Sequence, residues 1–395
     1  TNPKEAGDLA SPNLALPQSS DGNSPLIDRF SERLDDWLIQ KKRPHTVIRP
    51  PLGDSSPNSL LPLRVVSPAA MAGSHIRAEL RIQDGCDAHC TFCIIPKIRK
   101  TLRSKTIADS VDEATRLVEL GHPEIVLTGI FIGAYGHETA LRRNQKNPQS
   151  QPLADLLDAI AQIPGLKRLR LSSMEPGDVS GPLLDAMVAN SSVVVPHLHL
   201  PLQSGSDDIL KRMNRQYRVG DYLEMIDTVN EALCTADGLP PAITTDIICG
   251  FPGETDAQFQ QTYEVARQVG YLHMHVFPYS ARSGTAAARW TDQHLAPDVL
   301  KARVRRLIDL ESDPESGLSE VFRRRLVGHT IRVILEQPDK ADPSVMTGRC
   351  DHYALIHVPT DLPRGTVCDV NITGLDGSRT LGELAPLNHP LSVLR

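Results

Sequence analysis

The middle of the chain alternates short apolar runs with amphipathic stretches, and this alternation restricts the fold more than any other feature. Six apolar runs of strand length cover 76–83, 124–130, 167–173, 194–202, 242–250 and 271–279. Helical stretches of about 10–15 residues lie between them, a pattern typical of βαβ units around a parallel sheet. It predicts an α/β core over 76–313, either a curved, partly open barrel or a doubly wound sheet. In both, the site lies at the carboxyl ends of the strands.

The two flanks of this core have a different texture. Residues 1–75 are rich in Pro, Ser, Asn and Asp and contain one helical pattern, LIDRFSERLDDWLIQKK. We expect them to form a Pro-rich linker or the remnant of an N-terminal domain. Residues 315–386 contain FRRRLVGHTIRVILEQ, TGRCDHYALIHVP and GTVCDVNITGL, which alternate apolar and polar residues between turns. This part predicts a small antiparallel β-barrel.

Charge and cysteine content narrow the class of protein. The chain has 395 residues, a net charge of −6 and seven cysteines. An odd number of cysteines in a chain of this length does not fit a disulfide framework, so we expect a cytoplasmic protein. No apolar run approaches the roughly 18 residues of a membrane span. The negative charge argues against a surface that binds nucleic acid everywhere and leaves room for a local basic patch.

Three of the seven cysteines, Cys86, Cys90 and Cys93, fall within the segment GCDAHCTFC. Thiolates at this spacing converge on one metal centre, either zinc or an iron–sulfur cluster. Structural zinc takes four ligands, usually in two pairs, and here only His89 offers a nearby fourth. A [4Fe–4S] cluster held by three thiolates leaves one iron open for a small molecule.

This cysteine spacing, with Phe92 before the last cysteine, resembles the signature of radical S-adenosylmethionine (SAM) enzymes. Further blocks resemble the methylthiotransferases of that superfamily, from about residue 76 to 385: IQDGCDAHCTFCIIP, EIVLTGIFIGAYG, RLRLSSMEP, HLHLPLQSGSDDILKRMNRQYR, TDIICGFPGET and FPYSARSGT. The resemblance implies a (βα)6 partial TIM-like barrel followed by a small all-β domain of the TRAM type. It also implies a [4Fe–4S] cluster whose open iron binds SAM, and a 5′-deoxyadenosyl radical that abstracts hydrogen.

The blocks IQDGC, LTG with GAYG, and RLSSMEP look most like the branch that modifies threonylcarbamoyladenosine. That branch adds a methylthio group to carbon 2 of N6-threonylcarbamoyladenosine beside the tRNA anticodon. The alternatives are isopentenyladenosine in tRNA, an aspartate of a ribosomal protein, or a truncated tRNA-binding paralogue without sulfur insertion. The implied partners are the tRNA anticodon stem-loop and an electron donor such as flavodoxin or ferredoxin, with no membrane.

The resemblance also assigns residues. Cys86, Cys90 and Cys93 match the cluster ligands. The candidate cofactor-binding residues are Phe92, Thr128, Gly129, Ser172, Ser173, Glu175, Gln203, Gly250 and Pro252. Ordinary strand-to-loop turns and helix entries are the competing interpretation for several of these positions. His197 and His199 share one face of a strand, and we predict pocket or core histidines there rather than a metal pair.

Basic residues provide the candidate RNA contacts. Arg99, Arg103, Arg282 and Thr285 are candidates for substrate phosphates. Arg323, Arg324, Arg325, Arg332 and Arg349 are candidates for the RNA backbone on the C-terminal domain. A solvated surface charge is the competing interpretation for any one of them.

The chain departs from the family at its beginning. The family carries an N-terminal domain whose three cysteines hold a second [4Fe–4S] cluster that is implicated in sulfur delivery. This chain has no cysteine before Cys86 and does not begin with Met. We expect either truncation or a variant without the domain, and sulfur insertion is then in question. Lys97 and Lys100 in KIRKTLRS also replace an aromatic residue and a glycine, which alters the loop beside the cysteines.

Overall fold

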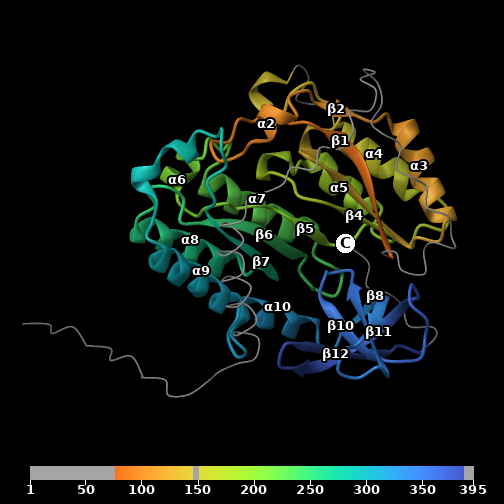
Figure 1. Ribbon diagram of the computed structural model, residues 1–395. Coiled ribbons are helices and arrows are strands. Elements are labelled where there is room, and N and C mark those ends of the chain that lie inside the picture. The colour runs from red at the N-terminus through yellow and green to blue at the C-terminus, as the bar shows by residue number, and fades with distance from the viewer. Residues whose placement is uncertain (1–75, 146–150, 387–395) are drawn as a thin grey trace, which may run out of the picture. The chain divides into compact units, whose positions relative to one another are not determined.

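The computed structural model describes residues 76–145 and 151–386, and all of these fall within one compact unit, Leu63–Arg395. Six parallel strands in this part of the chain form its α/β core (Figure 1): β1 (Arg77–Asp84), β3 (Glu124–Gly129), β4 (Arg168–Leu171), β5 (His197–His199), β6 (Ala242–Cys249) and β7 (His273–Pro278). β1, β3 and β4 are neighbours in one sheet, and β5, β6 and β7 in a second. A parallel bridge between Leu169 and Val194 links the two. The chain therefore forms a curled, partial barrel, and the six predicted strands are confirmed.

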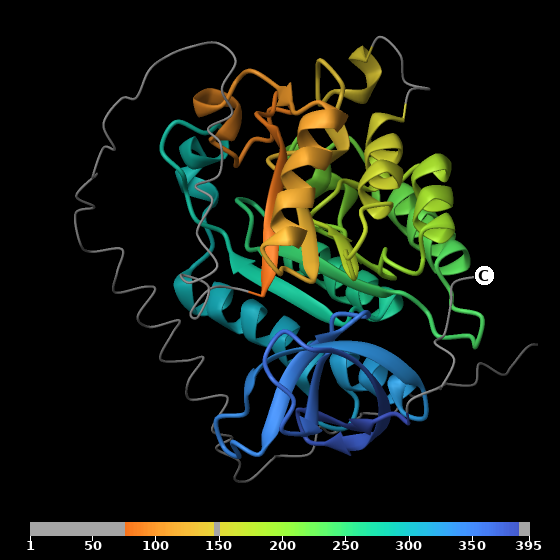
Figure 2. The ribbon, with the colours of Figure 1, turned by 90° about the vertical axis from the view of Figure 1, so that its right-hand side faces the viewer.

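Helices cover the outer face of these strands (Figures 1 and 2): α3 (Ile107–Glu119), α4 (Pro152–Ala161), α5 (Gly181–Ala189), α7 (Val219–Ala232), α8 (Asp256–Val269) and α9 (Pro297–Ser312). Their apolar stripes bury alternate strand residues such as Leu80, Ile125 and Leu127, all 0% exposed, in one cluster. Full burial of such a side chain stabilises the fold by about 1.5–3 kcal/mol. The helix ends follow local sequence, as α8 shows: a capping box of Thr255 and Gln258 begins it, and Gly270 (φ 72°) ends it.

The opposite face of the strands, which we call the inner face, is polar. Side chains of successive strand residues point to opposite faces, so the positions between the buried leucines and isoleucines point inward. These inner-face positions include Glu124 on β3, Arg170 on β4, His199 on β5 and Asp246 on β6. The strands thus place ionisable groups on the face where a partial barrel receives its ligands.

The C-terminal part is a closed barrel, shown in blue in Figure 2, with the strand order β10-β12-β11-β8-β9. Its strands are β8 (Thr330–Pro338), β9 (Val345–Cys350), β10 (Leu355–Pro359), β11 (Val367–Asp376) and β12 (Arg379–Leu384). Most pairs are antiparallel, and a parallel pair of β10 and β12 closes the ring. The small all-β domain predicted from the alternation is therefore confirmed as part of the fold class.

One prediction about this part is wrong. FRRRLVGHTIRVILEQ was assigned to the β-domain from its alternation, but its first five residues end helix α10 (Leu318–Leu326), and β8 begins only at Thr330. Leu318, Phe322 and Leu326 recur at a spacing of four and are all buried, which is the helical period. The arginines at 323–325 consequently lie on a helix.

The closed barrel contacts the first residues of the core strands through its β9–β10 turn. Arg168 Nη1 donates a hydrogen bond to the carbonyl of Arg349 at 2.8 Å, and Arg168 Nη2 pairs with Glu124 at 2.7 Å. The ring of Tyr353 stacks on His197 with centroids 4.5 Å apart. These contacts close the end of the inner face opposite to the carboxyl ends of the strands.

Some predictions are not tested by the described residues. The helix expected in LIDRFSERLDDWLIQKK and the character of 1–75 lie outside them, and the limits 76–313 and 315–386 stay predictions. Among the described helices, none combines the length and apolarity that crossing a membrane requires.

Candidate active site

The cysteine loop follows β1 and is fixed by its own backbone. Cys86 N–H donates to the carbonyl of Arg99 at 3.1 Å, and Cys93 N–H donates to Cys90 at 3.1 Å. Thr91 anchors the loop to the end of α6 (Asp207–Arg212), because its N–H donates to Met213 at 3.0 Å and its hydroxyl donates to Arg212 at 2.8 Å. The three thiols therefore project from a loop that is held at both sides.

Gly85 is required at the start of this loop, and it yields a test. Its φ is +84°, and an added Cβ would lie 2.1 Å from the carbonyl oxygen of Thr101. We expect Gly85→Ala to displace the loop, to cost about 1–3 kcal/mol of unfolding free energy, and to reduce the iron bound after anaerobic reconstitution. Gly121→Ala is the matched control, since Gly121 has φ +91° but open space around it. Equal iron content in the two variants would contradict the expectation.

Electrostatics connect the three thiols to one another. Burial raises the pKa of Cys86 to about 12, and the proximity of Cys90 and Cys93 adds to the rise. Burial also raises the pKa of Cys90, while Arg215 opposes it. The thiolate forms of Cys86 and Cys90 are therefore unfavourable as free ions, and a cationic metal centre would remove that penalty.

Arg215 connects Cys90 to the carboxylates that follow β4. Its Nη1 donates to Cys90 Sγ at 3.1 Å, and its Nη2 pairs with Glu175 Oε1 at 2.7 Å. Arg142 lies on the other side, 3.6 Å from Glu175 and 3.1 Å from Asp178. Burial raises the pKa of Asp178 to about 7 against the opposing charge of Arg142.

The candidate cofactor residues at the ends of β3 and β4 lie at one edge of the sheet, which we call the rim, because the two strands are parallel neighbours. Gly129 pairs in register with Gln83 of β1, where an added Cβ would lie 3.0 Å from the Gln83 backbone oxygen. Ser172 N–H donates to Leu127 at 3.0 Å, which continues the β3–β4 ladder, and Ser173 is exposed. Thr128 lies half-buried beside them at the end of β3. These hydroxyls and backbone groups lie at strand ends, as predicted.

The remaining candidate cofactor residues follow β5 and β6. Gln203 has φ +61°, and its Oε1 is buried without a hydrogen-bond partner among the described residues. Gly250 has φ +73° and donates its N–H to Glu254 at 3.0 Å, in the turn that contains Pro252. Phe92 of the cysteine loop packs edge-on against Phe251 of this turn, with centroids 6.4 Å apart. The cysteine loop and the GFPGET turn therefore lie side by side.

The candidate substrate residues lie on two neighbouring segments, because Lys97 of the segment after the cysteines donates a hydrogen bond to Gly284 of the 282–285 turn. Arg99 pairs with Asp84 at 2.7 Å, and Arg103 and Arg282 are exposed. Thr285 is only 4% exposed, and its hydroxyl donates to the carbonyl of Arg282 at 2.8 Å. That hydroxyl serves a turn, so its placement offers no support for a substrate contact.

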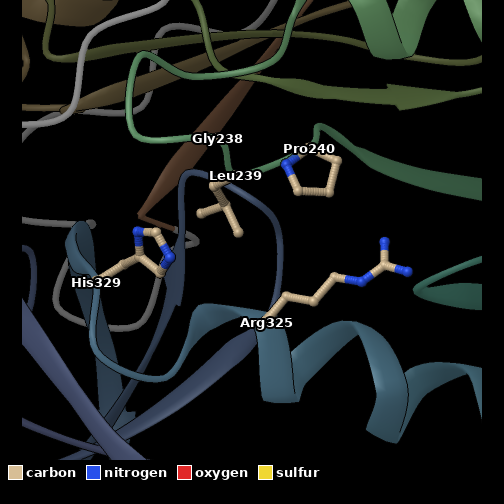
Figure 3. A pocket seen from close by; sticks show the side chains of 5 residues that line it. All are labelled: Gly238, Leu239, Pro240, Arg325 and His329. Carbon is tan, nitrogen blue, oxygen red and sulfur yellow. The ribbon is translucent and has the colours of Figure 1, made fainter.

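The candidate RNA-binding arginines separate into two groups. Arg323 and Arg324 pair with Glu320 on α10. Arg332 pairs with Asp351 at 3.0 Å, and the Arg349 guanidinium carbon lies 4.8 Å from the Tyr353 ring centre, so both lie near the β9–β10 turn. A cavity of about 340 Å³ borders Arg325, together with Gly238, Leu239, Pro240 and His329 (Figure 3).

Arg215 was not identified as a site residue from the sequence, although it lies in the segment RMNRQYR of one of the blocks that resemble the family. A signal existed, because an arginine that follows a short helix close to the strand ends can reach across to another loop. Its partner Cys90 lies 125 positions away, so only the fold pairs them.

The residues present fit an iron–sulfur cluster with a bound small molecule. Three thiols share one anchored loop, and Arg215 supports one of them. Glu175 Oε2 is buried 3.6 Å from Arg142 Nη1, but it has no hydrogen-bond partner among the described residues. A buried carboxylate oxygen in this state is suited to a ligand hydroxyl. A parallel partial barrel with this loop after its first strand defines a radical SAM type of protein.

Comparison with known proteins agrees. Residues 80–266 match the family model of the Radical SAM superfamily. The chain is 35% identical over 319 residues to a tRNA-2-methylthio-N(6)-dimethylallyladenosine synthase of Desulfitobacterium hafniense, covering 80% of this chain and 67% of the relative. It is 35% identical over 356 residues to the enzyme of that name from Agrobacterium fabrum, covering 89% and 73%.

A third relative carries a different name. The threonylcarbamoyladenosine tRNA methylthiotransferase MtaB of Bacillus subtilis is 37% identical over 279 residues, covering 70% of this chain and 58% of the relative. The chain thus spans a little over half to about three quarters of the length of such relatives. It belongs to the methylthiotransferase family of radical SAM enzymes. Membership implies a [4Fe–4S] cluster and SAM.

Proposed function

We propose that the chain is a tRNA methylthiotransferase that modifies carbon 2 of N6-threonylcarbamoyladenosine beside the anticodon. The observation that carries the proposal is the anchored loop of three thiols, one of them hydrogen-bonded by Arg215, in a member of the methylthiotransferase family. The blocks IQDGC and RLSSMEP favour this substrate. Isopentenyladenosine in tRNA is the second candidate, because a relative named for dimethylallyladenosine aligns over 89% of the chain.

In this proposal the residues at the carboxyl ends of the strands have different roles. Cys86, Cys90 and Cys93 hold the cluster, and when bound, cluster and SAM together supply the radical that activates the substrate carbon. Arg215 donates to one thiolate, and hydrogen bonds to cluster ligands tune reduction potentials. Glu175 orients Arg215 with Oε1, and its Oε2, which lies 3.6 Å from Arg142 and accepts no hydrogen bond from the described residues, would accept one from a ribose hydroxyl of SAM.

The other candidate cofactor residues would surround SAM on its remaining sides. Thr128 and Gly129 would approach its amino end, where the absent Cβ of Gly129 allows close backbone contact. Ser172 and Ser173 would offer hydroxyls to the ribose, and Gln203 would offer its Oε1, which accepts no hydrogen bond from the part of the chain that the structure describes. Phe92 and the turn of Gly250 and Pro252, which pack together through Phe251, would exclude water beside the adenine.

Analysis of tRNA nucleosides tests the proposal. A strain lacking its own methylthiotransferases is complemented with this chain, and its nucleosides are measured by mass spectrometry. We expect 2-methylthio-N6-threonylcarbamoyladenosine to appear. The methylthio derivative of isopentenyladenosine instead would support the second candidate. If neither appears while the purified protein still forms 5′-deoxyadenosine from SAM, sulfur insertion by this chain is contradicted and a tRNA-binding role is favoured.

Arg325 yields a prediction about tRNA binding. It is exposed at the cavity beside α10, where its guanidinium can reach a phosphate. We expect Arg325→Ala to weaken tRNA binding several-fold and to reduce the slope of log affinity against log salt by about 1. Arg305→Ala, which removes an arginine paired with Asp309 on α9, is the control and should leave the slope unchanged. Identical slopes for both variants would contradict a phosphate contact at Arg325.

A further inference from the structure

Two imidazoles and a carboxylate meet on the inner face at a place distinct from the cysteine loop. His199 lies on β5, Asp246 on β6 and His275 on β7, and their ligand-type atoms all lie within 4.8 Å of one another. The register explains the meeting: Asp246 is the direct partner of His275, and His199 pairs with Thr244, two positions before Asp246 on the same face. Three adjacent parallel strands therefore build one cluster.

The cluster is oriented in the way that metal-binding histidines are held. His199 Nδ1 shares a hydrogen bond with Thr244 Oγ1 at 2.9 Å, which fixes the ring. Its other nitrogen, Nε2, consequently faces Asp246 Oδ1 at 3.2 Å. A hydroxyl or carboxylate on the second ring nitrogen is the usual support of a ligating imidazole.

His275 completes the arrangement from the edge strand. Its ring lies 5.7 Å from that of His199, and its side chain is exposed, so it can turn toward an ion. The charged groups that act on it include the carboxylates of Asp246 and Glu311.

We propose that His199, Asp246 and His275 form a divalent-metal site on the inner face. Two imidazoles and one carboxylate on one side of an ion are typical of Fe²⁺ and related ions such as Mn²⁺. Such an ion keeps coordination positions open toward the inside of the partial barrel. There it would bind an oxygen or nitrogen atom of a molecule that enters the barrel. The site does not depend on the proposed function.

Binding of Mn²⁺ tests the site in the full chain. Mn²⁺ prefers nitrogen and oxygen ligands to thiolates, and the protein is purified anaerobically without added iron and sulfide. Titration followed by electron paramagnetic resonance should show one tightly bound Mn²⁺ per chain. Asp246→Asn and His275→Ala should each weaken binding by at least about 10- to 100-fold, the range for loss of a residue that only supports a ligand. His357→Ala, which removes a histidine paired with Asp339 on β10 of the closed barrel, is the matched control.

Two outcomes would overturn the site. One is Mn²⁺ binding that is equal in wild type, Asp246→Asn and His275→Ala, which means an adventitious ion only. The other is the absence of saturable binding to the wild type. Thermal unfolding without metal shows whether each variant folds. A Mn²⁺ soak of wild-type crystals, with an anomalous peak expected between the three side chains, decides the question independently of any variant.

Discussion

Cys93→Ala is expected to abolish cluster assembly and, with it, the formation of 5′-deoxyadenosine from SAM. The loop offers three thiols, and two thiolates leave a second iron without a protein ligand. The loss should exceed the roughly 10- to 100-fold effect of removing a residue that merely supports a metal ligand. Iron and sulfide content and visible absorption after anaerobic reconstitution measure assembly, and chromatography of 5′-deoxyadenosine measures cleavage.

Cys234→Ala is the matched control for this experiment, since it also removes a half-buried thiol but one outside the cysteine loop. It should assemble the cluster as the wild type does. A Cys93→Ala protein that retains wild-type iron content and cleavage would contradict the assignment of the ligands. Loss of both in Cys234→Ala as well would point to a general defect in folding instead.

The α/β core was predictable because its signals are local. Each strand buries one face against helices, so the apolar runs and the amphipathic stretches between them appear directly in the sequence. The strand predicted from Phe322 failed for a related reason. Alternation over FRRRLVG is short. Phe322 and Leu326 are buried against the closed barrel and Leu318 against the α/β core, and this spacing of four favours a helix, which a short window does not reveal.

The residues of the candidate site could be predicted from the sequence only where they lie close together in one segment of the chain. Cys86, Cys90 and Cys93 lie in one loop, so their spacing alone indicates a metal centre. Arg215 and the cluster of His199, Asp246 and His275 are assembled from segments that only the fold brings together. The sequence predicts only that His197 and His199 share one face of a strand, because the register that brings Asp246 and His275 to His199 is a property of the fold.

Glu124→Gln is expected to destabilise the protein by about 3–5 kcal/mol, the cost of breaking a buried ion pair by removing one partner. The Glu124 carboxylate is 0% exposed and pairs with Arg168 Nη2 at 2.7 Å and Arg170 Nε at 3.0 Å. Glutamine keeps the shape of the side chain but removes its charge. The buried guanidinium groups of Arg168 and Arg170 then have only one carboxylate left in this network, that of Asp351, which lies 3.4 Å from Arg168. Equilibrium urea unfolding at neutral pH measures the difference.

Glu264→Gln provides the contrast, because its partner Arg267 is 66% exposed and such a surface pair contributes only about 0–1 kcal/mol. Measuring the free energy of unfolding at acid pH then distinguishes the effect of the Glu124 charge from the effect of side-chain packing. Burial alone would raise the pKa of Glu124, but Arg168 and Arg170 outweigh it and lower the pKa to about 2, from an ordinary value of 4.5. A lowered pKa stabilises the fold above the ordinary value, and this contribution is lost as the pH falls toward 2. The stability gap between wild type and Glu124→Gln should therefore narrow over that interval. A gap that stays constant would mean that lost packing, and not the buried charge, causes the destabilisation.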